Sequence, residues 1–244
     1  MKREKILIFI PSYNVEKKIK RVLKWIPNSI LKKFNIKILI IEDNSKDSTL
    51  SIIRSIIKEK RKKININLIA NKKNKGYGGV QKIAFKYAIR KKFKYIVMLH
   101  GDNQYPANKI INLLNPLVTG NYDAVFGSRM INSLDAIKGG MPIYKYIGNV
   151  LLTFFQNIIL SSNLSEFHSG YRSYKVTSLK KIKYSKNTND FHFDTEIIIQ
   201  FLKKNFIIKE VAMPTYYGDE ISHLKSIPYG LNIVRTTILS RFKK

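Results

Sequence analysis

Cysteine is absent from this sequence of 244 residues, and acidic residues are scarce, with 16 against 45 lysines and arginines. The first absence excludes disulfide bonds and thiolate-bound metal centres. The second leaves a formal net charge of +29. Such a field attracts polyanions, whether nucleic acid, anionic lipid headgroups or phosphorylated substrates. The excess of positive charge can also come from a general bias in amino-acid composition, because lysine, isoleucine and asparagine are abundant together.

Long apolar runs are missing as well. No stretch reaches the ~18 uncharged apolar residues that a transmembrane helix needs, and the run Ile6–Ile10 is too short for a signal peptide. The nearest approach to a membrane span is Tyr146–Leu160, which Asn149, Gln156 and Asn157 interrupt. We expect that segment to form an amphipathic helix that is buried or lies at an interface.

Short apolar runs instead alternate with helical patterns. Hydrophobic residues make up 44% of the chain, which is enough for a sizeable core, so disorder is not expected. Strands are predicted at Ile6–Ile10, Ile36–Ile41, Ile64–Ile69, Tyr95–Leu99 and Tyr122–Phe126. Helices are predicted at 15–26, 50–57, 80–88 and 108–114. This alternation indicates βαβ units and an α/β fold with a mostly parallel central sheet flanked by helices.

The pattern changes after about residue 135, where a cluster of glycine and proline at 139–142 breaks the chain. The remainder is helical and rich in aromatic residues, with one late strand near Ile207–Met213. Neither a repeat nor a low-complexity linker separates the two parts. We therefore interpret residues 1–244 as a single domain with two halves, 1–134 and 135–244.

The loops that follow the predicted strands are the candidate site, because ligands of parallel α/β sheets bind at the carboxyl ends of the strands. Asp43 lies just after one predicted strand, and its carboxylate can accept hydrogen bonds from a nucleobase or a ribose. A helix N-cap network within 43–48 explains it equally well. The glycine-rich loop Asn74–Gly79 lets backbone approach an anion at a helix N-terminus, although an ordinary tight turn is the alternative.

The segment His100–Gln104 carries the most specific chemistry. Asp102 and Gln104 offer oxygen ligands two residues apart, which suits Mg²⁺ or Mn²⁺ bridged to a diphosphate. His100 is a poor ligand for Mg²⁺ and an acceptable one for Mn²⁺, or it donates to a phosphate oxygen. The alternative is a polar loop that caps the next helix before Pro106.

A second polar cluster comprises His168–Arg172 and Asp190–Glu196. Asp194 and Glu196, together with His168 or His192, have the chemistry of a metal site or an acid/base pair. Acidic residues at the N-terminus of a helix are the alternative.

Seven segments, taken in order, resemble inverting family-2 glycosyltransferases with the GT-A fold. The resemblance is to the dolichyl-phosphate mannosyltransferase-like and polyprenyl-phosphate glycosyltransferase-like group, over residues 5–220. The segments are IPSYN (10–14), IIEDNSKDST (40–49), NKGYGG (74–79), HGDNQYP (100–106), GSR (127–129), HSGYR (168–172) and DFHFDTEI (190–197). The resemblance implies a Rossmann-like GT-A fold in which 1–134 bind the nucleotide sugar and 135–244 form a helical, acceptor-side part.

The resemblance also implies a role for single residues. The nucleotide-sugar donor would be bound by Pro11, Tyr13, Asp43, Gly76, Gly101, Asp102 and Arg129. A Mg²⁺ or Mn²⁺ ion on the diphosphate would be held by Asp102, Gln104 and His100. The implied catalytic residues are Asp102, Arg129, which would approach a phosphate, and Glu196, which would lie near the acceptor. The sequence departs from the family pattern at His100, which replaces the first carboxylate of the usual Asp-x-Asp, and at Val15, which replaces a glutamate.

The implied reaction moves a sugar from a nucleoside diphosphate to an acceptor, with inversion at the anomeric carbon. A polyprenyl phosphate acceptor is already ionised, so it requires no strong base, and Arg129 and Arg172 would surround it with positive charge. A saccharide hydroxyl in surface polysaccharide synthesis would need a base, for which Asp194 or Glu196 are candidates. We expect a cytoplasmic protein, peripheral at the inner face of the membrane, with 146–160 pressed against the bilayer.

A basic nucleic-acid-binding protein is the rival class. It would place basic residues among aromatic ones on a single face, whereas the basic residues here are spread over most predicted helices. No nucleic acid partner is therefore expected. A pseudoenzyme that binds a sugar nucleotide without transferring it is a third interpretation, because of His100. The sequence leaves the oligomeric state open.

Overall fold

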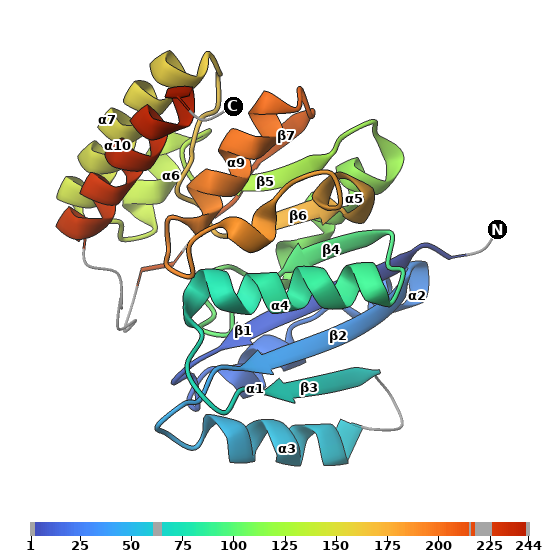
Figure 1. The fold of residues 1–244 in the computed structure, drawn as a ribbon. Coiled ribbons are helices and arrows are strands. Elements are labelled where there is room, and N and C mark those ends of the chain that lie inside the picture. Colours follow the sequence, from blue (N-terminus) through green and yellow to red (C-terminus); the bar gives the residue numbers. More distant parts are fainter. Residues whose placement is uncertain (1–2, 61–64, 215, 218–225, 243–244) are drawn as a thin grey trace.

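The residues that the structure describes form one seven-stranded sheet with helices packed against both faces (Figure 1). This computed structural model describes residues 3–60, 65–214, 216–217 and 226–242. The strands are β1 (Lys5–Ser12), β2 (Asn35–Glu42), β3 (Ile66–Ala70), β4 (Tyr95–Met98), β5 (Ala124–Ser128), β6 (Arg172–Lys175) and β7 (Ile208–Ala212). Their order is β3-β2-β1-β4-β6-β5-β7. Neighbouring strands run parallel except at β6, which is antiparallel to both β4 and β5.

Helices alternate with the strands along the chain, as expected for βαβ units. They are α1 (Ile19–Lys24), α2 (Asn28–Lys33), α3 (Thr49–Lys60), α4 (Gly76–Arg90), α5 (Ile110–Thr119), α6 (Ser133–Lys138), α7 (Ile143–Leu160), α8 (Val176–Leu179), α9 (Phe193–Lys203) and α10 (Ser226–Phe242), with 3-10 turns at Ala107–Lys109 and Tyr184–Lys186. The predicted α/β class with a mostly parallel sheet is confirmed.

The core lies on both faces of the sheet because successive residues of the central strands point to opposite sides. In β1, Ile6 and Ile8 pack with residues of α1, α3 and α5, whereas Leu7 and Phe9 pack with residues of α4 and α9. A strand covered on both faces needs a continuous apolar run. That requirement explains why simple apolar runs were enough to predict the parallel strands.

Several element boundaries differ from the prediction. The helix expected over 15–26 is shorter, because α1 covers only Ile19–Lys24; a separate helix, α2, begins after Pro27, where the prediction also ended the first one. The strand expected at Tyr122–Phe126 lies two residues later, at Ala124–Ser128. The start of the strand expected at Ile64–Ile69 lies outside the described residues, and β3 itself begins at Ile66.

Strand β6 was not predicted, because its sequence Arg-Ser-Tyr-Lys contains no apolar run. It lies between β4 and β5 and runs in the opposite direction. The chain therefore enters β6 at the edge where the parallel strands β4 and β5 end. This reversal brings residues 168–171 beside the loops that follow those two strands.

Both halves of the chain contribute to the sheet, since β6 and β7 come from 135–244. The division at 134/135 falls inside α6. At one end of the molecule, α7 and α10 pack side by side (Figure 1). Within the described part of the chain, we find no helix with the length and hydrophobicity needed to cross a membrane.

Candidate active site

Side-chain hydrogen bonds interlock the loops that follow β1 and β2. The amide of Asn14 donates to Ser45 Oγ (3.0 Å), and the amide of Glu16 donates to Asp47 Oδ2 (3.2 Å). Glu16 in turn accepts a hydrogen bond from the backbone of residue 48 at 2.9 Å. The two loops thus form one rigid rim, on which two of the predicted nucleotide-binding residues are partly exposed, Pro11 and Tyr13.

The carboxylate of Asp43 fixes the loop that leads into α4. Oδ1 accepts from Asn71 Nδ2 (2.7 Å) and from the Lys75 amide (2.8 Å), while Oδ2 accepts from the Gly76 amide (3.0 Å). The side chain is buried. Asp43 therefore caps the start of α4 from across the sheet edge, and it does not join the local network within 44–48 that was the alternative explanation.

Two predicted glycines are required by their surroundings. Gly76 has φ +76°, and a β-carbon there would lie 2.7 Å from the carbonyl oxygen of Asn189. A β-carbon on Gly101 would lie 2.8 Å from the carbonyl oxygen of Pro11. Glycine at these positions lets the start of α4 approach the segment before α9, and lets the loop after β4 approach the end of β1.

The loop after β4 presents Asp102 and turns His100 inward. Asp102 is partly exposed, and its Oδ1 accepts a hydrogen bond from the Gln104 amide (2.9 Å). The His100 ring meets Tyr105 edge-on, with 5.1 Å between ring centroids. Its Nε2 is buried and has no hydrogen-bond partner among the described residues. A β-carbon on Gly170 would lie only 2.5 Å from that nitrogen.

Arg129 forms a buried ion pair at the end of β5. Its Nε donates to Glu166 Oε1 (2.7 Å), its Nη2 also contacts Oε1, and its backbone amide donates to Oε2 (2.7 Å). Its Nη1 donates to the hydroxyl of Tyr217 (2.5 Å), and Asn149 Nδ2 donates to Glu166 from α7 (2.7 Å). Burial raises the pKa of Glu166, but Arg129 and its hydrogen bonds outweigh burial and hold that pKa below its ordinary value.

His168 joins this cluster as a neutral side chain. Its Nδ1 lies 3.0 Å from the hydroxyl of Tyr229 in α10, and its carbonyl oxygen accepts from Arg129 Nη2 (3.2 Å). Burial lowers the pKa of His168 to about 3. The imidazole is therefore uncharged at neutral pH.

The other members of the predicted second cluster have separate partners. Asp194 is buried; its Oδ2 accepts from the Tyr77 hydroxyl (2.8 Å) and its Oδ1 from Gln81 (2.8 Å). Glu196 accepts from the Thr188 amide (2.7 Å) and closes the loop before α9. Among the described residues, no three His, Asp or Glu side chains are grouped so that they could hold a metal ion.

Arg172 is not at the surface. Its side chain is buried, and Nε, Nη1 and Nη2 donate to the carbonyl oxygens of residues 169, 194 and 167. It also lies 3.8 Å from Asp194 Oδ2 and covers the ring of Phe126. The expectation that Arg172 surrounds an acceptor phosphate is therefore wrong, because its donors are used inside the protein.

The segment after β7 connects the Asp102 loop to the Arg129 cluster. The amide of Tyr216 donates to the carbonyl oxygen of Gln104 (3.4 Å), and the hydroxyl of Tyr217 accepts from Arg129. The loops after the parallel strands β1 to β5 thus lie along one edge of the sheet. Sequence reasoning missed Glu166, whose only signal was an acidic residue just before the HSGYR segment in a chain poor in carboxylates.

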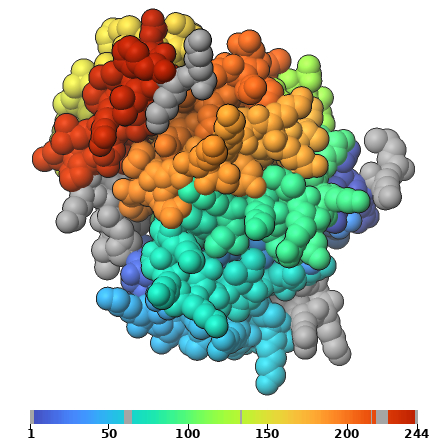
Figure 2. Space-filling model, viewed as in Figure 1, coloured from blue at the N-terminus to red at the C-terminus, as the bar shows by residue number. Residues whose placement is uncertain are grey.

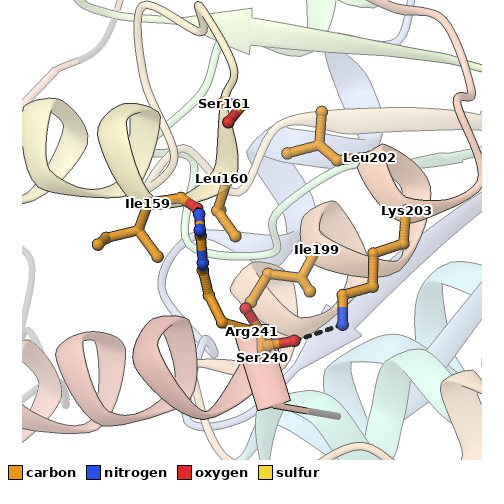
Figure 3. Close-up of a pocket in the computed structure, with 8 residues that line it drawn as sticks. All are labelled: Ile159, Leu160, Ser161, Ile199, Leu202, Lys203, Ser240 and Arg241. Carbon is orange, nitrogen blue, oxygen red and sulfur yellow. Dashed lines mark hydrogen bonds between the residues drawn. The ribbon is translucent and has the colours of Figure 1, made fainter. Parts of the chain in front are cut away.

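A cavity of about 290 Å³ lies elsewhere, between the C-terminal ends of α7, α9 and α10 (Figure 3). Lys203 Nζ donates to the carbonyl oxygen of Ser240, and Arg241 Nη1 donates to that of Ile159 (3.0 Å). Cations at the C-termini of helices satisfy terminal carbonyl groups. This cavity holds none of the predicted site residues, and its two charges serve as helix caps.

An open, mostly parallel sheet with polar loops at the strand ends defines a Rossmann-like class of proteins that bind ligands at that edge. The chain belongs to glycosyl transferase family 2, whose sequence profile matches residues 7–183. It is therefore a glycosyltransferase, and the predicted fold class and enzyme class are both confirmed.

Two relatives and one solved structure are similar to this chain over most of its length. An uncharacterized protein of Methanocaldococcus jannaschii is 31% identical over 227 residues, which cover 90% of this chain and 92% of that protein. The UDP-N-acetylglucosamine–dolichyl-phosphate N-acetylglucosaminyltransferase of Methanococcus voltae is 27% identical over 223 residues, 88% of this chain and 86% of that protein. Among solved structures, a mannosyltransferase of Pyrobaculum calidifontis in complex with GDP-Man and Mn²⁺ superposes with a TM-score of 0.59 at 15% identity; the match covers 89% of this chain and 58% of that one.

Proposed function

We propose that this enzyme transfers a sugar from a nucleoside-diphosphate sugar to a polyprenyl phosphate, with inversion at the anomeric carbon. The observation that carries the proposal is the single edge along which Asp102, the glycine-lined loops and Arg129 are gathered. The relative from Methanococcus voltae, named for transfer to dolichyl phosphate, supports the choice of acceptor.

The donor end of the site is proposed to lie over the loops after β1, β2 and β3. Pro11 and Tyr13 are partly exposed there and would contact the nucleotide. Asp43 is proposed to act through the loop 71–76, since its oxygens already accept hydrogen bonds from that loop. Gly76 and Gly101 would leave room for the diphosphate to approach backbone amides.

The residues present fit a divalent metal ion, Mg²⁺ or Mn²⁺, which would lower the negative charge on the leaving diphosphate when bound. Mg²⁺ is commonly held by one or two carboxylates together with substrate phosphates. Asp102 supplies one partly exposed carboxylate, and Gln104 lies two residues further on. His100 Nε2 is turned toward Gly170, so we propose that Asp102, with Gln104, holds the ion and that His100 supports the loop.

The acceptor end is proposed to lie at Arg129. Its Nη1 would exchange the hydroxyl of Tyr217 for the acceptor phosphate, while Glu166 holds the other edge in place. A phosphate acceptor attacks as an anion and requires no base. This suits the structure, because Asp194 is buried with both oxygens bonded. Glu196 is proposed to position the loop at 188–193 near the acceptor.

A lipid-borne acceptor requires the enzyme to work at a membrane. We propose that it acts as a cytoplasmic protein, peripheral on the inner face of the membrane, with the excess of basic residues drawn to anionic lipid. No nucleic acid partner is proposed.

The test is a transfer assay with the full chain, a panel of UDP-, GDP- and dTDP-sugars, and Mg²⁺ or Mn²⁺. We expect labelled sugar to appear on a polyprenyl phosphate and Asp102→Asn to lower the rate by about a hundredfold or more. Asp135→Asn removes an exposed carboxylate from α6 and serves as the matched control. Transfer to saccharide hydroxyls, with none to polyprenyl phosphate, would refute the proposed acceptor and leave the transferase class intact.

A further inference from the structure

Helix α7 buries polar side chains and exposes apolar ones, which is the reverse of a helix on the surface of a water-soluble protein. The residues that it buries are polar, namely Asn149, Thr153 and Gln156. The residues that it exposes are large and apolar, namely Ile143, Tyr144, Ile147, Val150, Leu151, Phe154 and Ile158. Leu151 and Phe154 are 62% and 64% exposed. An amphipathic helix normally turns its apolar stripe toward the core, so the outer face of α7 requires an apolar partner.

Helix α10 repeats this arrangement beside α7. It buries Thr237 and Ser240 along with Ile233, and it exposes Ile227, Leu231, Ile238, Leu239 and Phe242. The two helices pack side by side at the outer edge of the molecule, where Figure 2 shows α10 in red and α7 in yellow. Their outer faces, here called the α7/α10 face, together expose far more apolar surface than scattered single residues would.

Charge identifies the partner that fits the α7/α10 face. Neither helix contains an acidic residue, and the charged residues present are Lys145, Arg235 and Arg241. A second copy of a chain with net charge +29 would be repelled, whereas an anionic bilayer would attract this face. Helices with one apolar face and basic residues lie in the plane of the membrane interface.

The inner faces of the same two helices reach the Arg129 cluster. Asn149 of α7 donates to Glu166, which pairs with Arg129 (2.7 Å in each case). Tyr229 of α10 bonds to His168, whose carbonyl oxygen accepts from Arg129. The helices that carry the apolar face therefore touch the environment of Arg129 from two sides.

We propose that the α7/α10 face seats on an anionic lipid bilayer, and that Asn149 and Tyr229 couple this seating to the position of Arg129. The coupling rests on the proposed function, whereas the seating does not. Seated helices would hold Glu166 and His168 fixed, so that Arg129 is ordered at the membrane surface, where a lipid phosphate is presented.

Vesicle flotation tests the seating without any assay of activity. We expect the full chain to float with phosphatidylcholine vesicles that contain phosphatidylglycerol, and to bind less as salt is raised. The double variant Leu151→Ser/Phe154→Ser should bind at least about tenfold more weakly, because two side chains no longer enter the bilayer. The control Trp25→Ser/Ile207→Ser changes two exposed apolar residues that belong to neither helix and should bind as the parent does. Equal binding by the first variant, or a dimer in sedimentation equilibrium that the first variant abolishes, would overturn the proposal.

Transfer to a short-chain, water-soluble prenyl phosphate tests the coupling. Vesicles should raise the rate of the parent enzyme and leave that of Leu151→Ser/Phe154→Ser unchanged. Asn149→Ala/Tyr229→Phe should float like the parent but lose the stimulation. A parent enzyme that binds vesicles without being stimulated would overturn the coupling. If transfer is undetectable throughout while flotation keeps its pattern, the proposed function fails and the membrane face stands.

Discussion

Gly170 lies directly against the edge of the His100 ring, so that a β-carbon at 170 would be 2.5 Å from His100 Nε2 and 2.9 Å from the Tyr77 hydroxyl. The histidine that replaces a carboxylate in the HGD segment thus occupies space left by the glycine of the HSG segment. The two segments are far apart in sequence, and each one constrains the residue type of the other.

Gly170→Ala is expected to destabilise the fold by about 1–3 kcal/mol, as overpacking of a close interior does. Adding His100→Ala should recover part of that loss, with a coupling free energy of about 0.5–3 kcal/mol in a double-mutant cycle, since the smaller side chain removes the clash. Urea unfolding monitored by circular dichroism measures both values.

The control for this cycle is Gly148→Ala in α7, where a β-carbon meets no atom within 4 Å. Alanine favours a helix interior over glycine by about 1 kcal/mol, so this variant should be neutral or more stable. If the changes in the free energy of unfolding caused by His100→Ala and Gly170→Ala were additive, the close packing of these two residues would be contradicted.

Measured metal affinity should distinguish the role of Asp102 from that of His100. In the presence of a nucleoside diphosphate, Asp102→Asn should weaken Mn²⁺ binding by about tenfold or more, because the ion loses its charged ligand. His100→Asn should keep the affinity close to that of the parent, because Nε2 faces Gly170. Electron paramagnetic resonance of free Mn²⁺ gives both affinities, and a comparable loss in the two variants would restore His100 as a ligand.

Breaking the buried ion pair should destabilise the protein, and the effects of changing its two partners should be coupled. Glu166→Gln leaves the Arg129 charge without its partner and is expected to lower the free energy of unfolding by about 3–5 kcal/mol. The double variant Arg129→Gln/Glu166→Gln should lose less than the sum of the two single changes. Asp135→Asn, an exposed change, should stay within about 0.5 kcal/mol of the parent. The pair would be unimportant for stability if Glu166→Gln matched that control in urea unfolding.

Acid should destabilise the protein through His168. The unfolded histidine takes up a proton near its ordinary pKa of 6.5, whereas burial lowers the folded pKa to about 3. The contribution to stability is therefore complete above pH 6.5 and is lost as pH falls toward 3, at up to about 1.4 kcal/mol per pH unit.

His168→Gln removes that titration and should flatten the pH dependence of unfolding between about pH 6 and pH 4. His192→Gln should keep the steeper dependence, because His168 is still present. Identical slopes for the parent and His168→Gln would show that the folded histidine is protonated more easily than its burial implies.

The sequence predicted the parallel strands because buried parallel strands need continuous apolar runs, as in β1 and β2. It could not predict β6, where Arg172 is buried and satisfied by carbonyl oxygens rather than excluded from the core. Helix α10 contains proline, glycine and asparagine near its start, which obscured its helical pattern.

The candidate site, like the fold, could be predicted only in part. The order of the loops predicted which residues meet at the sheet edge. Spacing alone could not show that His100 points inward, because a side chain's direction depends on the residues packed around it. Nor could it pair Arg129 with Glu166, 37 residues away, since the pairing depends on how distant segments fold together.

The reversed strand β6 also has a consequence for assembly of the fold. Because β4 and β5 each pair with β6 and not with each other, a nascent chain that has not yet supplied residues 172–175 has no hydrogen-bonded bridge between the two strands. Asp102 follows β4 and Arg129 follows β5, so in such a fragment the two residues would be related through the packing of α5 on both strands, without a strand between them. The binding edge can be completed only late in synthesis, and an amino-terminal fragment ending before β6 should not bind donor and acceptor together.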